Sequence, residues 1–319
     1  MRSHSRPFQP VRFSVLCLLS TCLLLTACQP APQESLAQTT EASNPNVLLL
    51  SGQNNHDWQE THIMLKEIIE EAGMFDLSIS LTPQKGAEAA AWEDWEPNFA
   101  AYDAIVLDYN GEMWPDVIKK EFEDYVSGGG AVYVVHASNN PFPGWTAYEE
   151  MVGILWRNQD TGTRVYMDAD GDLVKHAPGK DRGAGHGKLY DWQIQVRDAE
   201  HPIMKDVPEV WLHAHDELYH GQRGPAKNMN ILATAYSDPE RGGSDQHELM
   251  MWWIPYEQGK VLTFLAGHHW PNQEDVNAYK CVGFRTMITR GIEWLATGDV
   301  KTPVPEDFPT ADKLSLATN

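Results

Sequence analysis

Cysteine is scarce in this chain of 319 residues, which contains only four. Three of them, Cys17, Cys22 and Cys28, lie within the first 28 residues, and Cys281 is the only other one. A disulfide framework needs paired cysteines, and a cysteine metal cluster needs several. The sequence therefore excludes both for the body of the chain.

Basic residues are also few, because 24 Lys and Arg stand against 45 Asp and Glu and give a formal net charge of −21. A surface of this sign repels phosphate backbones, so we do not expect nucleic acid as a partner. Hydrophobic residues make up 42% of the chain and aromatic residues 10%, which excludes global disorder. The oligomeric state stays open.

The apolar run at residues 13–25 is too short to span a bilayer, and three arginines precede it. A basic segment followed by a short apolar run is typical of a secretory signal peptide. We therefore predict that residues 1–27 are a signal peptide that is removed.

The segment Leu25-Thr26-Ala27-Cys28 resembles a bacterial lipobox, in which the cysteine is lipidated, for example with palmitate, and becomes the first residue. The alternative is an ordinary signal peptide with an incidental cysteine. Gln29 at the second position favours the outer membrane, so we expect a lipoprotein anchored at Cys28 in the cell envelope and facing the periplasm. Residues 28–45, rich in Gln, Pro, Ala, Ser and Thr, predict a flexible tether.

Apolar runs typical of strands buried on both faces occur at residues 46–52, 102–111 and 131–135. Segments with helical spacing, 59–72 and 115–126, lie between them. Strand–helix units in succession predict an α/β fold with a doubly wound, mostly parallel sheet.

Shorter strands follow after residue 144, and we expect them to form inserted β-hairpins. The acidic segment Asp168–Asp172 resembles the front of a calcium loop, but Gly179 stands where such a loop needs a bidentate glutamate. The pair Asp170-Gly171 instead favours a hairpin turn. We predict one domain over residues 46–298, ending in a helix, and a loose tail at residues 299–319.

Three histidine-bearing loops follow predicted strands, and they contain His56, His136 and the pair His268-His269. Ligands of open α/β sheets bind at the carboxyl ends of the strands, so we expect these loops to meet at one edge. No Gly-x-Ser-x-Gly elbow precedes a helix, which argues against a serine hydrolase of that type. The segment 183–187 lacks the spacing of a phosphate loop, and we interpret it as a mobile loop.

A fourth cluster is His213-x-His215-Asp216-Glu217. Residues two apart in a strand share a face, so His213 and His215 are candidate metal ligands. Imidazole with carboxylate suits zinc or another divalent metal, and equally suits metal-free acid–base chemistry. The cofactor therefore stays unknown, with zinc as one option.

In combination these motifs resemble one family. The Gly128–Gly130 turn before the strand that ends in His136, the Gly185-His186 pair, His201-Pro202-Ile203, the run from Trp211 to Tyr219, and Gly267-His268 before a terminal helix are similar in order and spacing to the ThuA-like (trehalose utilisation) family. The resemblance covers roughly residues 46–298. It implies a class I glutamine amidotransferase-like, flavodoxin-like sheet.

The resemblance also implies a role in carbohydrate catabolism through 3-keto-sugars. We expect His136, Asp216, Glu217 and His268 to be the catalytic residues, acting by isomerisation or hydrolytic cleavage of a keto-sugar or glycoside, with or without a metal. Residues expected to contact the substrate are His56, Trp58, Tyr219, His269 and Trp270. Because His136 takes the place of the amidotransferase cysteine and Cys281 lies in a helix, thiol acyl transfer is excluded.

Two other functions fit the same residues. One is a membrane-anchored carbohydrate-binding protein without catalysis, which would use the aromatic side chains of the cleft. The other is a metallohydrolase that acts on a different polar substrate. The sequence does not decide between these functions and a carbohydrate-active hydrolase or isomerase.

Overall fold

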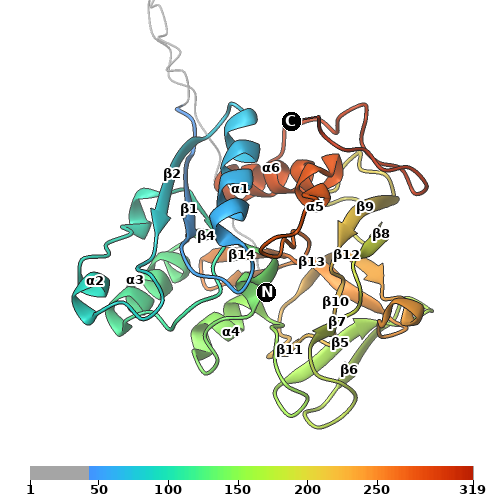
Figure 1. Ribbon diagram of the computed structural model, residues 1–319, viewed down its shortest axis with the longest axis horizontal. Helices are drawn as coiled ribbons and strands as arrows, with labels where there is room; N and C mark the ends of the chain where they lie inside the picture. Colours follow the sequence, from blue (N-terminus) through green and yellow to red (C-terminus); the bar gives the residue numbers. More distant parts are fainter. Residues whose placement is uncertain (1–42, 319) are drawn as a thin grey trace, which may run out of the picture. The chain divides into compact units, whose positions relative to one another are not determined.

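The computed structural model describes residues 43–318, so the predicted signal peptide, Cys28 and most of the tether lie outside the described residues. The first part of the described chain alternates strands with helices (Figure 1). Its elements are β1 (Asn46–Ser51), α1 (Trp58–Glu71), β2 (Asp76–Leu81), α2 (Ala89–Glu93), η1 (Phe99–Ala101), β3 (Ala104–Leu107), α3 (Asp116–Ser127), β4 (Ala131–Val135), η2 (His136–Asn139) and α4 (Thr146–Val152).

The second part consists mainly of strands and closes with helices. Its elements are β5 (Thr163–Met167), β6 (Leu173–His176), β7 (Gly185–His186), β8 (Tyr190–Val196), β9 (Val210–Asp216), β10 (Tyr219–His220), β11 (Arg223–Gly224), β12 (Asn230–Tyr236), η3 (Pro239–Arg241), β13 (His247–Tyr256), β14 (Gly259–Phe264), α5 (Asn277–Lys280) and α6 (Val282–Thr297). The predicted hairpin around Asp170-Gly171 is confirmed, since β5 pairs antiparallel with β6.

The main sheet is mixed, with the strand order β2-β1-β3-β4-β14-β13-β12-β8-β9. The neighbouring pairs from β2 to β14 are all parallel, whereas those from β14 to β9 are all antiparallel. The prediction of an α/β fold is confirmed, but the prediction of a mostly parallel sheet was wrong. Beyond residue 163 the described connections include few helices, and antiparallel strands need no crossover helix between them.

Both faces of the parallel half are covered. In β1, Val47 and Leu49 belong to the hydrophobic core that includes residues of α1 and α6, whereas Leu48 and Leu50 belong to the core that includes residues of α3 and α4. Successive side chains of a strand point to opposite faces, so a strand between two helical layers is apolar throughout. This explains the continuous apolar runs of the sequence.

The segment predicted to be a loose tail is in fact packed against the domain. Leu212 donates its N–H to the carbonyl of Thr310 at 2.9 Å, and Leu316 forms a bridge with Cys281. The ring of Phe308 is 8% exposed and lies 5.3 Å from that of Trp211, between centroids. The tail is ordered because it covers the edge strand β9, whose backbone groups would otherwise lack partners.

Tryptophan serves mainly as a packing residue, because seven of the twelve are buried. Trp270, by contrast, is 36% exposed and lies within the connection between β14 and α5. Among residues 43–318, no helix combines the length and the apolar character needed to cross a membrane.

Asp108, just after β3, is a buried carboxyl group that accepts hydrogen bonds from Thr61 Oγ1 at 2.7 Å and Ser51 Oγ at 3.1 Å. Burial raises the pKa of Asp108 to about 7, although these hydrogen bonds oppose the rise. The folded protein therefore holds this proton more tightly than the unfolded chain does. Its stabilising contribution is complete below the unfolded pKa and is lost as the pH rises through about 7.

We predict that Asp108→Asn, which mimics the protonated acid, gains stability over the wild type as the pH rises. The difference in free energy of unfolding should grow by on the order of 2 kcal/mol between about pH 5 and about pH 8. Urea unfolding at both pH values measures it, with the exposed Asp103→Asn just before the same strand as a control for loss of charge. A difference that stays constant with pH would contradict the prediction.

Candidate functional site

His136 is the first residue of η2 and follows β4 directly, and its φ is 44°. This left-handed backbone is strained for a residue other than glycine, and such strain is concentrated at functional sites. Nδ1 of His136 lies 2.7 Å from the carbonyl oxygen of Leu265 in the neighbouring β14–α5 connection. Since a carbonyl only accepts, Nδ1 carries the proton and Nε2 offers a lone pair.

His56, in the loop after β1, is fixed in the same way. Its Nδ1 lies 3.2 Å from Oδ1 of Asn54, and the same oxygen accepts the backbone N–H of His56 at 3.2 Å. The backbone contact shows that the amide oxygen of Asn54, and not its nitrogen, faces the ring. Nδ1 of His56 is therefore the donor, and Nε2 again has a free lone pair.

Glu217 and His268 come from the ends of two further strands, β9 and β14. Oε1 of Glu217 accepts a hydrogen bond from Nε1 of Trp270 at 3.1 Å. The same oxygen lies 3.4 Å from Nε2 of His268 and 3.2 Å from Nδ1 of His186. Neither ring nitrogen of His268 has a hydrogen-bond partner within residues 43–318.

These side chains form a compact buried group, which we call the histidine cluster: His56, His136, Glu217 and His268. Ring centroids are separated by 4.8 Å for His56 and His136, 5.0 Å for His56 and His268, and 5.7 Å for His136 and His268. No member is more than 5% exposed. The ligating atoms of His56, His136 and Glu217 all lie within 4.8 Å of one another, so these three could hold a metal.

Burial favours the uncharged form of every group in the cluster. Burial, with repulsion from neighbouring histidines, lowers the pKa of His268 to about 3 and also lowers the pKa of His56 and of His136. Burial and the charge of Asp216 raise the pKa of Glu217 to about 8. An imidazole without a proton can accept one or bind a metal, so the electrostatics allow both kinds of chemistry.

Asp216, one of the expected catalytic residues, connects the loops around the cluster. Its carboxylate lies 2.6 Å from Nε2 of His213 and accepts backbone N–H groups from Glu217 at 2.6 Å, Gly267 at 2.8 Å and His268 at 3.1 Å. These bonds join the end of β9 to the end of β14. They therefore place Glu217 and His268 next to each other.

The structure does not bring His213 and His215 into one metal site. His213 is fully buried and bonded to Asp216, whereas the side chain of His215 is 42% exposed and lies 3.6 Å from Asp275. Residues two apart do share a face in a regular strand, but the pairing of β8 with β9 contains a register shift. The two side chains do not converge, because His213 is enclosed in the core whereas His215 lies at the surface beside Asp275.

The other predicted contacts are distributed around the cluster. Tyr219 packs against His136 with centroids 4.5 Å apart, and Trp270 lies 4.5 Å from His56. Of the adjacent pair, His268 faces the cluster, whereas Nε2 of His269 lies 2.8 Å from Oε2 of Glu60. Trp58 stacks near His62, with centroids 5.6 Å apart, and lines a neighbouring hollow.

That hollow has a volume of about 330 Å³ and is formed by the loops after β1 and β3 together with the start of α1. Its lining includes Trp58, Asn54, Asn55, Asn110 and Glu112. Asn54 also orients His56, so the hollow adjoins the histidine cluster. Amide and carboxylate groups beside an indole ring are suited to a sugar, whose hydroxyls need hydrogen bonds and whose ring stacks on aromatic faces.

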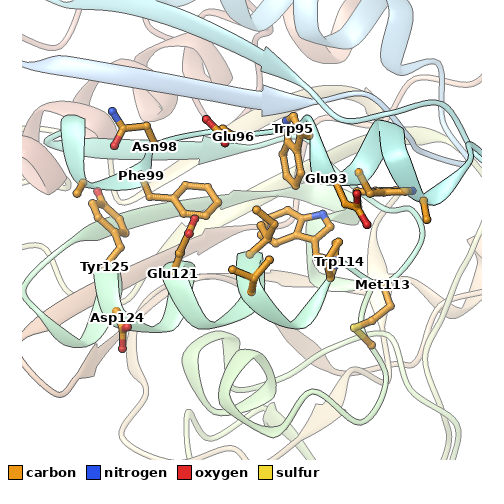
Figure 2. Close-up of a pocket in the computed structure, with 16 residues that line it drawn as sticks. Glu93, Trp95, Glu96, Asn98, Phe99, Met113, Trp114, Glu121, Asp124 and Tyr125 are labelled. Atoms are coloured by element: carbon orange, nitrogen blue, oxygen red, sulfur yellow. The ribbon is translucent and has the colours of Figure 1, made fainter.

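A larger groove of about 970 Å³ lies elsewhere, between the α2–η1 segment and α3 (Figure 2). Trp95, Phe99 and Trp114 form much of its apolar lining, and Glu93 and Glu121 are among its carboxylates. No member of the histidine cluster lines it. Size alone therefore does not identify the site.

His186 is a residue near the cluster that the sequence analysis did not select. Its strand β7 pairs with β10, placing His186 opposite Tyr219 and beside Glu217. Within the segment 183–187, expected to be a mobile loop, Gly185 and His186 form the strand β7, and the His186 side chain is 35% exposed. A Cβ on Gly185 would lie 2.8 Å from His220 Nε2, and one on Gly187 would lie 2.3 Å from the carbonyl of Arg241. The alternating glycines were the available signal.

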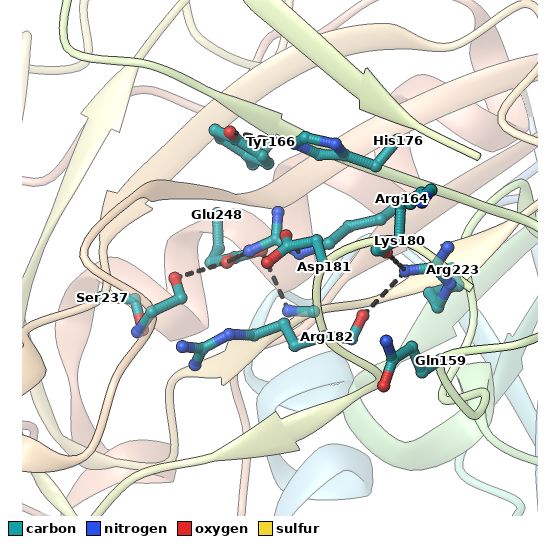
Figure 3. Close-up of polar contacts among 12 residues, drawn as sticks. Gln159, Arg164, Tyr166, His176, Lys180, Asp181, Arg182, Arg223, Ser237 and Glu248 are labelled. Carbon is teal, nitrogen blue, oxygen red and sulfur yellow. Dashed lines mark hydrogen bonds and ion pairs between the residues drawn. The ribbon is translucent and has the colours of Figure 1, made fainter. Parts of the chain in front are cut away.

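Two buried arginines hold the chain that leads to His186 (Figure 3). The guanidinium of Arg223 donates to the carbonyls of Ala177, Lys180 and Arg182 at 2.9, 3.1 and 2.7 Å. Arg164 forms ion pairs with Glu248 and Asp181, both at 2.7 Å. These contacts bind the 177–182 segment to the sheet and so fix the position of β7.

Comparison with known proteins gives this arrangement a context. The family model described as ThuA, trehalose utilisation, matches residues 46–295. The chain belongs to the ThuA family. None of the curated proteins matches it.

Solved structures agree with this assignment. A ThuA-like protein from Parabacteroides merdae ATCC 43184 is 38% identical, with a TM-score of 0.80, and the match covers 86% of this chain and 98% of that one. A ThuA-like protein from Bacteroides uniformis ATCC 8492 is 15% identical, with a TM-score of 0.52 and coverage of 84% and 97%. The second likeness concerns the fold alone.

We predict that Asp216→Asn destabilises the protein by about 3 kcal/mol, because it leaves His213 and backbone N–H groups buried without a full set of acceptors. The control is Asp275→Asn in the connection between β14 and α5, which removes the partly exposed partner of His215 and should cost less than about 1 kcal/mol. Urea unfolding of both variants measures the costs. Equal costs would show that the Asp216 carboxylate does not organise the site.

Proposed function

We propose that the protein is an enzyme of carbohydrate catabolism that transfers a proton next to the ketone of a 3-keto-sugar or keto-glycoside. The family description, trehalose utilisation, supports a carbohydrate-related role. The observation that carries the chemistry is His268. It is fully buried, both of its ring nitrogens lack a partner in the described chain, and Nε2 lies 3.4 Å from Glu217.

A ketone at C3 acidifies the proton on C2, and removing that proton leaves an enolate. The reaction needs one group that accepts the proton and others that stabilise the developing oxyanion. In this proposal His268 accepts and returns the proton, and Glu217 orients its ring. The Nε2 atoms of His56 and His136 carry lone pairs, so they would stabilise the oxyanion only through a cation bound between them. Isomerisation and elimination of a glycosidic leaving group both begin with this step.

The hollow beside His56 is the proposed sugar-binding region. Its indole ring, Trp58, offers a stacking face, and its amides offer hydrogen bonds to hydroxyls. Trp270 covers the cluster and donates to Glu217, which shields the reacting groups from bulk water.

The wider setting of the protein is also a proposal. We infer that the parallel half is flavodoxin-like, since its order β2-β1-β3-β4-β14 corresponds to the order 2-1-3-4-5 of that fold. We further propose that the chain is anchored through lipid on Cys28 at the periplasmic face of the outer membrane. This location rests on the lipobox and on Gln29.

Exchange of the C2 proton tests the function directly. We predict that the wild type catalyses deuterium incorporation at C2 of a 3-keto-glucoside in D₂O, observed by proton NMR. His268→Gln should reduce the rate by about 10²–10⁴-fold, the usual contribution of a positioned proton-transfer group. His215→Gln, an exposed histidine outside the cluster, should retain the rate.

Two results would overturn the proposal. One is a wild-type protein that binds keto-sugars but leaves them unchanged, which would favour the non-catalytic carbohydrate-binding function. The other is a His268→Gln variant that keeps the wild-type rate while sharing its circular dichroism and melting temperature.

A further inference from the structure

The histidine cluster contains an unusual number of polar atoms without partners. Nε2 of His56, Nε2 of His136 and both ring nitrogens of His268 are buried and form no hydrogen bond within residues 43–318. Each unpaired buried polar atom costs about 1–3 kcal/mol, and native proteins contain few of them. Four such atoms in one small region indicate that a ligand belongs there.

The orientation of two of these nitrogens identifies the kind of ligand. Backbone and amide oxygens hold the Nδ1–H groups of His136 and His56, as described above. Both rings therefore point a lone pair, and not a proton, at the shared space. Histidines that bind metals are fixed in this way, with the second ring nitrogen donating to a carbonyl or amide oxygen. An anion would instead need N–H or O–H groups that donate hydrogen bonds to it.

Glu217 supplies the third group that can bind a metal. Its hydrogen bond from Trp270 and its contacts with His186 and His268 all use Oε1, which leaves Oε2 as the oxygen available to a metal. We propose that His56, His136 and Glu217 bind a divalent transition metal of the zinc class. Two imidazoles and one carboxylate are a known zinc set that leaves a fourth position open for water or substrate.

The distances are compatible with this assignment. Atoms that share a tetrahedral zinc with bonds near 2 Å lie roughly 3.3 Å apart. One ligating atom from each of the three residues lies within 4.8 Å of the other two, and side-chain rotation would bring them onto one ion. Magnesium and calcium prefer all-oxygen sites, which this group does not provide. His268 contacts the Glu217 carboxylate and remains beside the metal as the proton-transfer group.

A second group of potential ligands, Asp57, Glu60 and His269, lies nearby and is a useful contrast. The Glu60 side chain is 59% exposed, and its carboxylate already pairs with Nε2 of His269 at 2.8 Å. Nε2 of His269 therefore has a partner, although its Nδ1 has none within residues 43–318. We assign no metal to it, and Glu60→Gln is the matched control.

The catalytic use of the metal rests on the proposed function, since it would bind a substrate oxygen at the open position and stabilise the enolate. The metal site itself does not depend on that function. The two are separated by measuring metal binding without sugar and proton exchange with it.

The experiment uses the full-length chain purified in detergent, stripped with chelator and titrated with Zn²⁺ alone by calorimetry. Metal content after dialysis is measured by mass spectrometry, and Co²⁺ replaces zinc to give a visible spectrum. We expect one Zn²⁺ per chain. Glu217→Gln and His136→Asn should weaken binding at least 100-fold, whereas Glu60→Gln and His215→Gln should not change it. Asparagine is chosen at position 136 because it tolerates a positive φ.

His268→Gln distinguishes the two proposals, because it should keep the zinc and lose proton exchange. Zinc binding that is lost in Glu60→Gln but retained in Glu217→Gln would place the metal in the other group and overturn the inference. Absence of tight Zn²⁺ binding by a folded wild type would also overturn it, even if keto-sugars are turned over. Zinc bound by the predicted ligands without any turnover would support the metal site and refute the proposed function.

Discussion

The arrangement of the site depends on one buried carboxylate, that of Asp216. The strands β9 and β14, whose ends it joins, have three strands between them in the sheet order. In a flat sheet they would lie about 19 Å apart. The antiparallel half must therefore curve back on itself, and the bonds from Asp216 to the N–H groups of Gly267 and His268 join the two ends of that curve.

The hydrogen bonds of Asp216 connect the parallel and the antiparallel halves of the sheet. The parallel half supplies His56 and His136 from the carboxyl ends of β1 and β4, as open α/β sheets supply most of their ligand contacts. The antiparallel half supplies Glu217 from the edge strand β9. The parallel half alone would supply imidazoles without a carboxylate, and the antiparallel half adds the carboxylate of Glu217.

Burial determines what the assembled groups can do. Removing water from several imidazoles and one carboxyl group lowers the pKa of the former and raises the pKa of the latter, so each group prefers its neutral form. Neutral imidazoles with oriented lone pairs are prepared for a proton or a metal. The aromatic residues Trp270 and Tyr219 maintain this dry environment by packing directly on the rings.

The sequence by itself determined the strands, the helices and the loops that carry His56, His136 and His268, because apolar periodicity and strand ends are local properties of the chain. It also named Glu217 and Asp216 as candidate site residues, but it grouped His213 with His215 and did not select His186 as a site residue. Only the tertiary structure decided these roles. Whether a side chain faces a cavity or a buried partner depends on the register and curvature of strands far apart in sequence, which no local pattern encodes.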